Sequence, residues 1–315
     1  MTIRGLSKTF PGTKALDRVD LDLRAGEVHA MVGQNGCGKS TLIKVLAGYH
    51  QPDPGTEIRL AGEPVDLHDT TASRNAGFRF VHQDLGLVET LSAVENLTLG
   101  RELDTAFGGR IRWRAERRDV ERRIHTLGYD FDVRRPVAEL GAAERTGIAI
   151  ARALWDWEEA RALVVDEPTA SLPREEVKTL FAALDRVRKR GLGVIYVSHR
   201  LDEIFTIGDR VTVLRDGRLV GTWGVGELNQ DKLVSLMLGG EELRPPHDRT
   251  FAGTHDVALD VRQLRGLEVD NLDLQAKRGE VVGIAGLTGS GREESYRCSL
   301  ALHRGAVRCA STDRP

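Results

Sequence analysis

The sequence predicts an α/β protein built on a parallel sheet. Short apolar runs alternate with helix-length stretches, and one of the runs leads into a glycine-rich loop. Helical patterns lie between the runs, for example over Glu144–Trp157 and Arg174–Arg190. Parallel strands need such crossovers, because the chain must return to the other end of the sheet. The five expected strands are Val28–Val32, Phe78–His82, Leu163–Asp166, Val194–Ser198 and Arg210–Leu214.

Length and composition indicate an ordinary globular protein of about two domains. Charged residues make up 29% and hydrophobic residues 40% of the 315 positions, which excludes a disordered chain. The net charge of −2 argues against a strongly basic nucleic-acid-binding surface. Cys37, Cys298 and Cys309 have no paired spacing, which excludes a disulfide framework and a CxxC zinc site. No apolar run could span a membrane and the N-terminus does not read as a signal peptide, so we expect a cytoplasmic protein.

A phosphate-binding loop follows the first of these strands. The segment GQNGCGKS fits the pattern GxxxxGK[ST], and a helix is expected from Lys39 to Ala47. Glycines let the backbone N–H groups face a phosphate, and the helix adds its positive end. Lys39 offers a charge to the β- and γ-phosphates, and Ser40 offers a hydroxyl to Mg²⁺. The candidate contacts are Gly33, Gln34, Asn35, Gly36, Cys37, Gly38, Lys39, Ser40 and Thr41.

A second chemical site is expected where the strand Leu163–Asp166 ends. Asp166 and Glu167 place two carboxylates at the edge of the sheet where ligands of α/β proteins bind. We expect Asp166 to hold Mg²⁺ through water, and Glu167 to orient and polarise an attacking water. Two exposed acids without a function are the alternative, which the neighbouring phosphate loop disfavours.

Five motifs occur in the order found in the ATP-binding cassette (ABC) ATPases, and the chain resembles that family to about residue 295. The motifs are Gly33–Thr41, Gln83, Leu140–Glu144, Asp166–Thr169 and Ser198-His199. The resemblance implies a P-loop NTPase cassette with a RecA-like parallel core and an N-terminal antiparallel β-subdomain. It also implies an inserted helical subdomain over about residues 86–157, with ATP and Mg²⁺ as ligands.

The resemblance implies roles for four further residues. Gln83 matches a catalytic-site glutamine that senses Mg²⁺ and water where a transmembrane partner docks. His199 matches the histidine that contacts the γ-phosphate, and Phe10 matches the aromatic residue that stacks on adenine. Gly141 stands where the family's signature, LSGGQ, has a serine that binds the γ-phosphate held by a second cassette. Losing that hydrogen bond is expected to cost about 1.5–3 kcal/mol.

The phosphate loop and its flanks recur later in the chain, at Arg278–Ser295. In this copy Arg292 replaces the lysine, and Glu293, which would repel phosphates, replaces the hydroxyl residue. We therefore expect a first cassette over residues 1–238, a linker over 239–254, and the truncated start of a second, altered cassette over 255–315. Two interpretations of residues 296–315 stay open, namely a shifted reading frame and a flexible tail.

The tandem layout and the segments VSHRLDEIF and VTVLRDGRLVGT most resemble the double-cassette subunits of monosaccharide importers of the ribose, galactose or xylose type. This resemblance implies an ATPase on the inner face of the plasma membrane that energises sugar import. The implied partners are transmembrane permease subunits, a second cassette and, indirectly, a sugar-binding protein, with no nucleic acid. A non-hydrolysing nucleotide-binding regulator and a tandem-cassette translation factor are the alternatives. Without a second signature, we expect the chain to bind Mg-ATP but to hydrolyse it slowly alone.

Overall fold

The computed structural model describes two compact units, which meet in sequence between Glu242 and Leu243. Each unit is considered by itself. The described residues are 1–101, 103, 105–106, 110–169, 172–239, 256–266, 268–285, 290–292 and 294–295.

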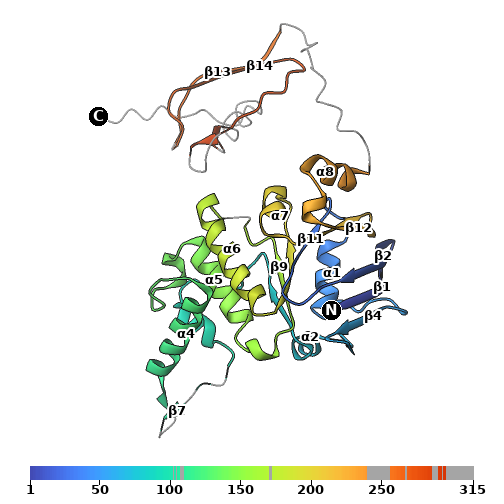
Figure 1. The fold of residues 1–315 in the computed structure, drawn as a ribbon. Coiled ribbons are helices and arrows are strands. Elements are labelled where there is room, and N and C mark those ends of the chain that lie inside the picture. The colour runs from blue at the N-terminus through green and yellow to red at the C-terminus, as the bar shows by residue number, and fades with distance from the viewer. Residues whose placement is uncertain are drawn as a thin grey trace. The chain divides into compact units, whose positions relative to one another are not determined.

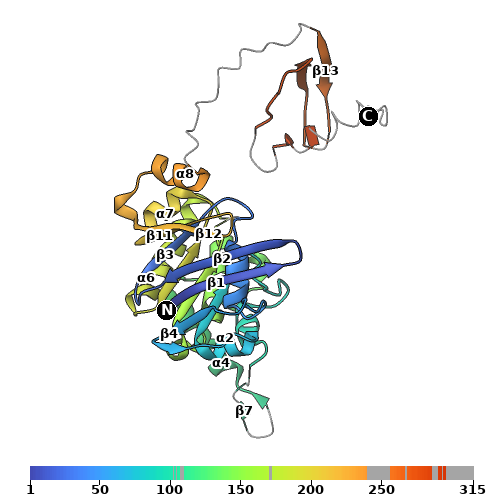
Figure 2. The ribbon, with the colours of Figure 1, turned by 90° about the vertical axis from the view of Figure 1, so that its right-hand side faces the viewer.

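The first unit opens with an antiparallel sheet in the order β2-β1-β4-β5, as the resemblance implies. This sheet faces the viewer in Figure 2, in front of helix α1 (Lys39–Leu46). Its inward side chains, among them Ile3, Leu6 and Val19, share a hydrophobic cluster with Leu42 and Ile43 of α1. The strands are β1 (Thr2–Phe10), β2 (Thr13–Asp22), β4 (Glu57–Leu60) and β5 (Glu63–Pro64).

A six-stranded sheet in the order β12-β11-β3-β10-β9-β6 forms the centre of the unit. Its members are β3 (Val28–Val32), β6 (Phe78–Val81), β9 (Ala162–Asp166), β10 (Gly193–Val197), β11 (Arg210–Arg215) and β12 (Arg218–Gly224). From β11 to β6 all neighbours are parallel, and only β12 is antiparallel. The parallel core is thus confirmed, and the five expected strands lie within one residue of their predicted bounds.

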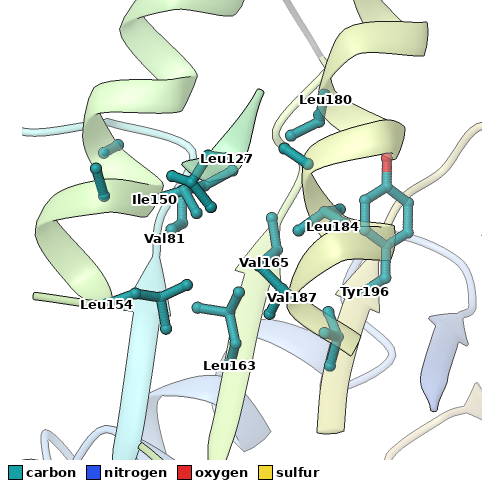
Figure 3. Packing of buried hydrophobic residues seen from close by; sticks show 14 of the residues in the cluster. Val81, Leu127, Ile150, Leu154, Leu163, Val165, Leu180, Leu184, Val187 and Tyr196 are labelled. Carbon is teal, nitrogen blue, oxygen red and sulfur yellow. The ribbon is translucent and has the colours of Figure 1, made fainter. Parts of the chain in front are cut away.

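Alternate residues of the central strands pack on opposite faces of this sheet. Val164 and Ile195 join the cluster that contains α1, whereas Leu163, Val165 and Tyr196 join a cluster with the helices of the other face. Figure 3 shows this second face, where side chains of α5 (Ala142–Ala153) and α6 (Arg174–Lys189) meet those of the strands. Both faces are covered, so these strands are apolar throughout.

Helices α3 (Ala93–Thr98), α4 (Trp113–Leu127) and α5 form the inserted helical part, with a small hairpin of β7 (Thr105–Ala106) and β8 (Arg110–Ile111) (Figure 1). Helix α5 begins two residues before the predicted Glu144, because Glu144 caps it as the third helical residue. It ends at Ala153, and a 3₁₀ turn follows at Trp157–Glu159. The remaining helices are α2 (Thr70–Ala76), α7 (Leu201–Ile207) and α8 (Gln230–Leu238), with 3₁₀ turns at Val137–Glu139 and Val225–Glu227.

In the second unit, the described residues form one antiparallel pair, β13 (Val257–Leu264) and β14 (Leu272–Lys277), over a small cluster of Val261, Leu264 and Val269. Glu293 and most of the second phosphate loop lie outside the described residues, as do residues 296–315 and the expected linker except Gly239. Within the described parts of both units, every helix is too short or too polar to cross a bilayer.

Candidate functional site

The sequence motifs gather because neighbouring parallel strands end at one edge of the sheet. The register pairs Val81 with Val165, Asp166 with Val197, and Val197 with Met31. The segments that follow β6, β9, β10 and β3 therefore leave the sheet at the same level. Those segments carry Gln83, Glu167, His199 and the phosphate loop respectively.

The phosphate loop turns through three glycines with positive φ. These are Gly33 at +155°, Gly36 at +81° and Gly38 at +107°, the last of which caps α1. A Cβ on Gly33 would collide with the Leu214 carbonyl, whereas a Cβ on Gly36 would meet nothing within 4 Å. The loop is thus packed against β11 on one side and open beside Gly36. An open space bordered by loop N–H groups and a helix start fits a phosphate.

Lys39 lies within this loop and is only 8% exposed. Its ammonium donates to the carbonyl oxygens of Gly33 at 2.7 Å and Gln34 at 3.1 Å, and lies 3.7 Å from Cys37 Sγ. The ammonium is therefore held over the loop, where it can exchange a carbonyl for a phosphate oxygen. Cys37 is 4% exposed and packs in the core beneath the loop.

The other candidate phosphate-loop residues divide into exposed and anchored ones. Gln34, Asn35 and Ser40 are exposed, and Thr41 is half-buried. Gln34 donates through Nε2 to the carbonyl oxygen of Met237 at 3.2 Å, which ties the loop to the end of α8. Ser40 stands in the first turn of α1 with its hydroxyl available to a ligand.

Glu167 and His199 are brought together at the end of β9. His199 Nδ1 lies 3.4 Å from Glu167 Oε2, and the two side chains are 58% and 24% exposed respectively. The Glu167 backbone has φ of +46°, and its N–H donates to the Val197 carbonyl oxygen at 2.9 Å. A left-handed φ is uncommon for a non-glycine residue and often marks a functional site.

Asp166 is half-buried beside this pair. Burial, followed by the charge of Glu167, raises the pKa of the Asp166 carboxyl, while His82 and Lys39 oppose the shift. A nearby cation would favour the charged form. This carboxylate is therefore suited to a positively charged ligand.

Gln83 and Phe10 lie at the margins of the site. Gln83 is exposed in the turn after β6. Phe10 ends β1, its ring edge-on to His50 with centroids 5.2 Å apart, and Lys8 Nζ lies 5.2 Å from the ring centre. Within the described residues, neither side chain forms a hydrogen bond or ring contact with the phosphate loop, so their roles remain predictions.

Gly141 is the N-cap of α5, and carboxylates already occupy this helix start. The Gly141 N–H donates to Glu144 Oε2 at 2.7 Å, and the Ala143 N–H donates to Glu176 Oε2 at 2.7 Å. The sequence did not identify Glu176, which reaches α5 from the first turn of α6. A phosphate that approached these amides would have to displace two negative charges.

Comparison with known proteins places this geometry in a family. The family model described as "ABC transporter" matches residues 16–170. The chain is 44% identical over 313 residues to the ribose import ATP-binding protein RbsA 2 of Rubrobacter xylanophilus, covering 97% of this chain and 59% of that protein. It is 41% identical over 301 residues to a putative ribose/galactose/methyl galactoside import ATP-binding protein of Burkholderia lata, covering 94% of this chain and 58% of that protein. The chain thus spans about three-fifths of the length of these relatives.

Solved structures share the fold. The ADP conformation of MJ1267, an ATP-binding cassette of an ABC transporter, superposes with a TM-score of 0.63 at 22% identity, covering 76% of this chain and 98% of that one. CbiO1 from Clostridium perfringens, part of an ABC transporter complex, superposes with a TM-score of 0.62 at 26% identity, covering 78% of this chain and 95% of that one. The chain therefore contains an ATP-binding domain of the ABC transporter family.

Proposed function

We propose that this chain binds Mg-ATP and hydrolyses it to energise the import of a sugar, a monosaccharide in particular. The observation that carries the proposal is that β3, β9 and β10 end at the same edge of the sheet. This places Lys39 and its loop level with Glu167 and His199, whose Oε2 and Nδ1 atoms lie 3.4 Å apart. The import of a sugar is supported by the names of the relatives, a ribose import ATP-binding protein and a putative ribose/galactose/methyl galactoside import ATP-binding protein.

ATP would bind with its phosphates in the open space beside Gly36. The loop N–H groups and the start of α1 would bind phosphate oxygens, and the Lys39 ammonium would move from a loop carbonyl to the β- and γ-phosphates. Phe10, half-buried at the end of β1, would stack on adenine.

Mg²⁺ fits the oxygen donors that these residues offer. Ser40 would provide its hydroxyl, Gln83 its amide oxygen and Asp166 its carboxylate. When bound, the ion supplies charge neutralisation on the phosphates.

Hydrolysis would follow from Glu167 and His199. The Glu167 carboxylate would orient a water and accept its proton as the water oxygen bonds to the γ-phosphorus. The bond from that phosphorus to the β–γ bridging oxygen would break, and ADP would leave with that oxygen. His199, half-exposed beside Glu167, would donate to the charge that develops on the γ-phosphate.

The proposed partners are transmembrane permease subunits, a second cassette and, indirectly, a sugar-binding protein, with no nucleic acid. The proposed location is the inner face of the plasma membrane. In this arrangement residues 1–238 are one cassette, 239–254 a linker, and 255–315 the start of a second, altered cassette. The hairpin of β13 and β14 supports the last assignment, since β1 and β2 form a similar antiparallel pair before the first phosphate loop.

The test is ATP hydrolysis by the purified chain over a range of protein concentrations, with ATP binding measured on the same samples. Glu167→Gln is the variant that is expected to lack hydrolysis. Glu175→Gln is the control, because Glu175 is exposed and pairs only with Lys178 among the ion pairs of the described residues. We expect binding in all three proteins, with turnover lost in Glu167→Gln alone.

Each outcome has a distinct meaning. Turnover that rises steeply with concentration supports hydrolysis in a pair of chains. Binding without turnover at any concentration contradicts hydrolysis by this chain and favours the nucleotide-binding regulator. Absence of binding contradicts the proposal as a whole.

A further inference from the structure

A buried carboxylate that the proposed reaction does not use lies behind the catalytic edge. Glu203, in the first turn of α7, is 2% exposed. Its Oε2 accepts hydrogen bonds from Tyr196 Oη at 2.8 Å, Ser198 Oγ at 2.8 Å and Thr169 Oγ1 at 2.9 Å. One oxygen atom thus accepts hydrogen bonds from three hydroxyl groups, two at the end of β10 and one in the segment that follows β9.

A basic side chain also faces this carboxylate. Glu203 Oε1 lies 3.1 Å from Arg200 Nε, although without hydrogen-bond geometry. Burial and the Glu203 carboxylate raise the pKa of Tyr196, so the phenol stays protonated and donates. A buried carboxylate is costly unless it is paired and hydrogen-bonded, and here both conditions are met.

The three hydroxyl donors connect Glu203 to both halves of the catalytic pair. Thr169 stands two residues after Glu167, and Ser198 stands immediately before His199. Ser198 Oγ also accepts from the Arg200 N–H at 3.0 Å, which fixes the turn on the far side of His199. Glu203 therefore ties together the two loops whose side chains must meet.

The backbone at Glu167 needs such support. Its φ of +46° is a conformation that persists only where the surroundings hold it. The hydrogen bond from its N–H to Val197 holds one end of this turn, and the Thr169–Glu203 hydrogen bond holds the other.

We propose that Glu203 is a positioning residue for ATP hydrolysis, which clamps the Glu167 loop to the His199 turn without touching substrate. This inference rests on the proposed hydrolysis, but the clamp itself is a property of the protein alone. A glutamine at this position keeps the shape and loses the anion. Three hydroxyl groups would then compete for a neutral oxygen, and an amide N–H₂ would face Arg200.

The experiment compares Glu203→Gln with Glu27→Gln. Glu27 is also a buried carboxylate, 7% exposed, and is 3.4 Å from both His29 and Arg210, but it precedes β3 at the opposite edge of the sheet. The measurements are kcat, KM for ATP, ATP affinity and melting temperature. Hydrogen exchange is followed in peptides that contain the Glu167 and Arg200 amides.

For Glu203→Gln we expect kcat to fall by about 10- to 100-fold, with KM and ATP affinity within about twofold, because misplaced catalytic groups slow the reaction without weakening binding. Exchange at the two amides should accelerate. Glu27→Gln should lose a comparable amount of stability with unchanged kcat and unchanged exchange in these peptides. Tyr196→Phe removes one donor and keeps the carboxylate, so it should change kcat and exchange in the same direction but by less. This variant tests the inference if Glu203→Gln does not fold.

Wild-type kcat or wild-type exchange in a folded Glu203→Gln protein overturns the inference. For Tyr196→Phe, unchanged exchange has the same meaning. If the wild-type chain hydrolyses no more ATP than Glu167→Gln, the proposed hydrolysis fails instead. The exchange measurements, which need no turnover, still decide whether Glu203 clamps the two loops.

Discussion

Two helices of this protein begin at motifs implicated in phosphate binding, yet their first turns differ in charge. Helix α1 starts after Gly38, has no acidic residue in its first turn, and holds the Lys39 ammonium against the loop. Helix α5 starts after Gly141, and two of its first amides are bonded to carboxylates of Glu144 and Glu176.

The difference shows what makes a helix start an anion site. Every helix has unpaired N–H groups in its first turn and a positive end. At α1 the glycine turns leave space beside these groups, and the nearest charge is positive. At α5 the protein supplies its own anions, so an incoming phosphate would compete with charges tethered to the fold. Four sets of variants test this comparison, from the largest expected effect to the smallest.

Removing the positive charge at α1 should have the largest effect. In Lys39→Ala, ATP affinity should fall by about 10- to 150-fold, since a charged hydrogen bond to phosphate contributes roughly 1.5–3 kcal/mol. Titration with ATP measures this. Lys44→Ala is the matched control, because Lys44 is exposed in the last turn of the same helix. Equal losses in both variants would mean that net charge, and not the loop, attracts ATP.

Alanine substitutions at two glycines of the loop distinguish the loss of space for a phosphate from steric strain in the folded loop. Both have positive φ, but a Cβ on Gly38 would lie 2.7 Å from Leu16 Cδ2 and 2.8 Å from the Ala15 carbonyl oxygen. We expect Gly38→Ala to cost about 1–3 kcal/mol more stability than Gly36→Ala, as measured by denaturant unfolding. Gly36→Ala should weaken ATP binding with a smaller loss of stability, because its methyl group would point into open space. ATP affinity that is unchanged in Gly36→Ala would show that the phosphate does not occupy that space.

The sequence predicts the parts of this arrangement that depend on neighbouring residues. The loop around Lys39 and the strand that ends at Asp166 follow from local patterns, since a glycine turn and an apolar run carry their own signal. The contact of Glu176 with the start of α5 and that of Glu203 with Thr169 do not follow from such patterns, because each contact joins residues more than thirty positions apart. Such contacts depend on how α6 and α7 pack, which no local pattern records.

Removing a carboxylate from the start of α5 should have a moderate effect on stability. Glu176→Ala removes the carboxylate that accepts from the Ala143 N–H, so the free energy of unfolding should fall by about 1 kcal/mol, the usual contribution of a helix cap. Thermal unfolding measures this change. Glu175→Ala, one residue earlier on α6 and exposed, is the control and should change stability by less than about 0.5 kcal/mol. Identical melting curves for the two variants would mean that Glu176 does not cap α5.

The smallest effect is expected from Gly141→Ser, which restores the serine of the family signature. The backbone there has φ of −65° and ψ of 162°, which suits any N-cap residue, and a Cβ would make only ordinary contacts with Glu144 and Glu176 at 3.6–3.9 Å. Serine is a better N-cap than glycine by a few tenths of a kcal/mol, so stability should rise slightly. Turnover should not rise in this variant alone, because the carboxylates still hold the amides. It should rise only in Gly141→Ser combined with Glu176→Gln. A rise with Gly141→Ser alone would show that the missing hydroxyl, and not the tethered anions, limits this helix start.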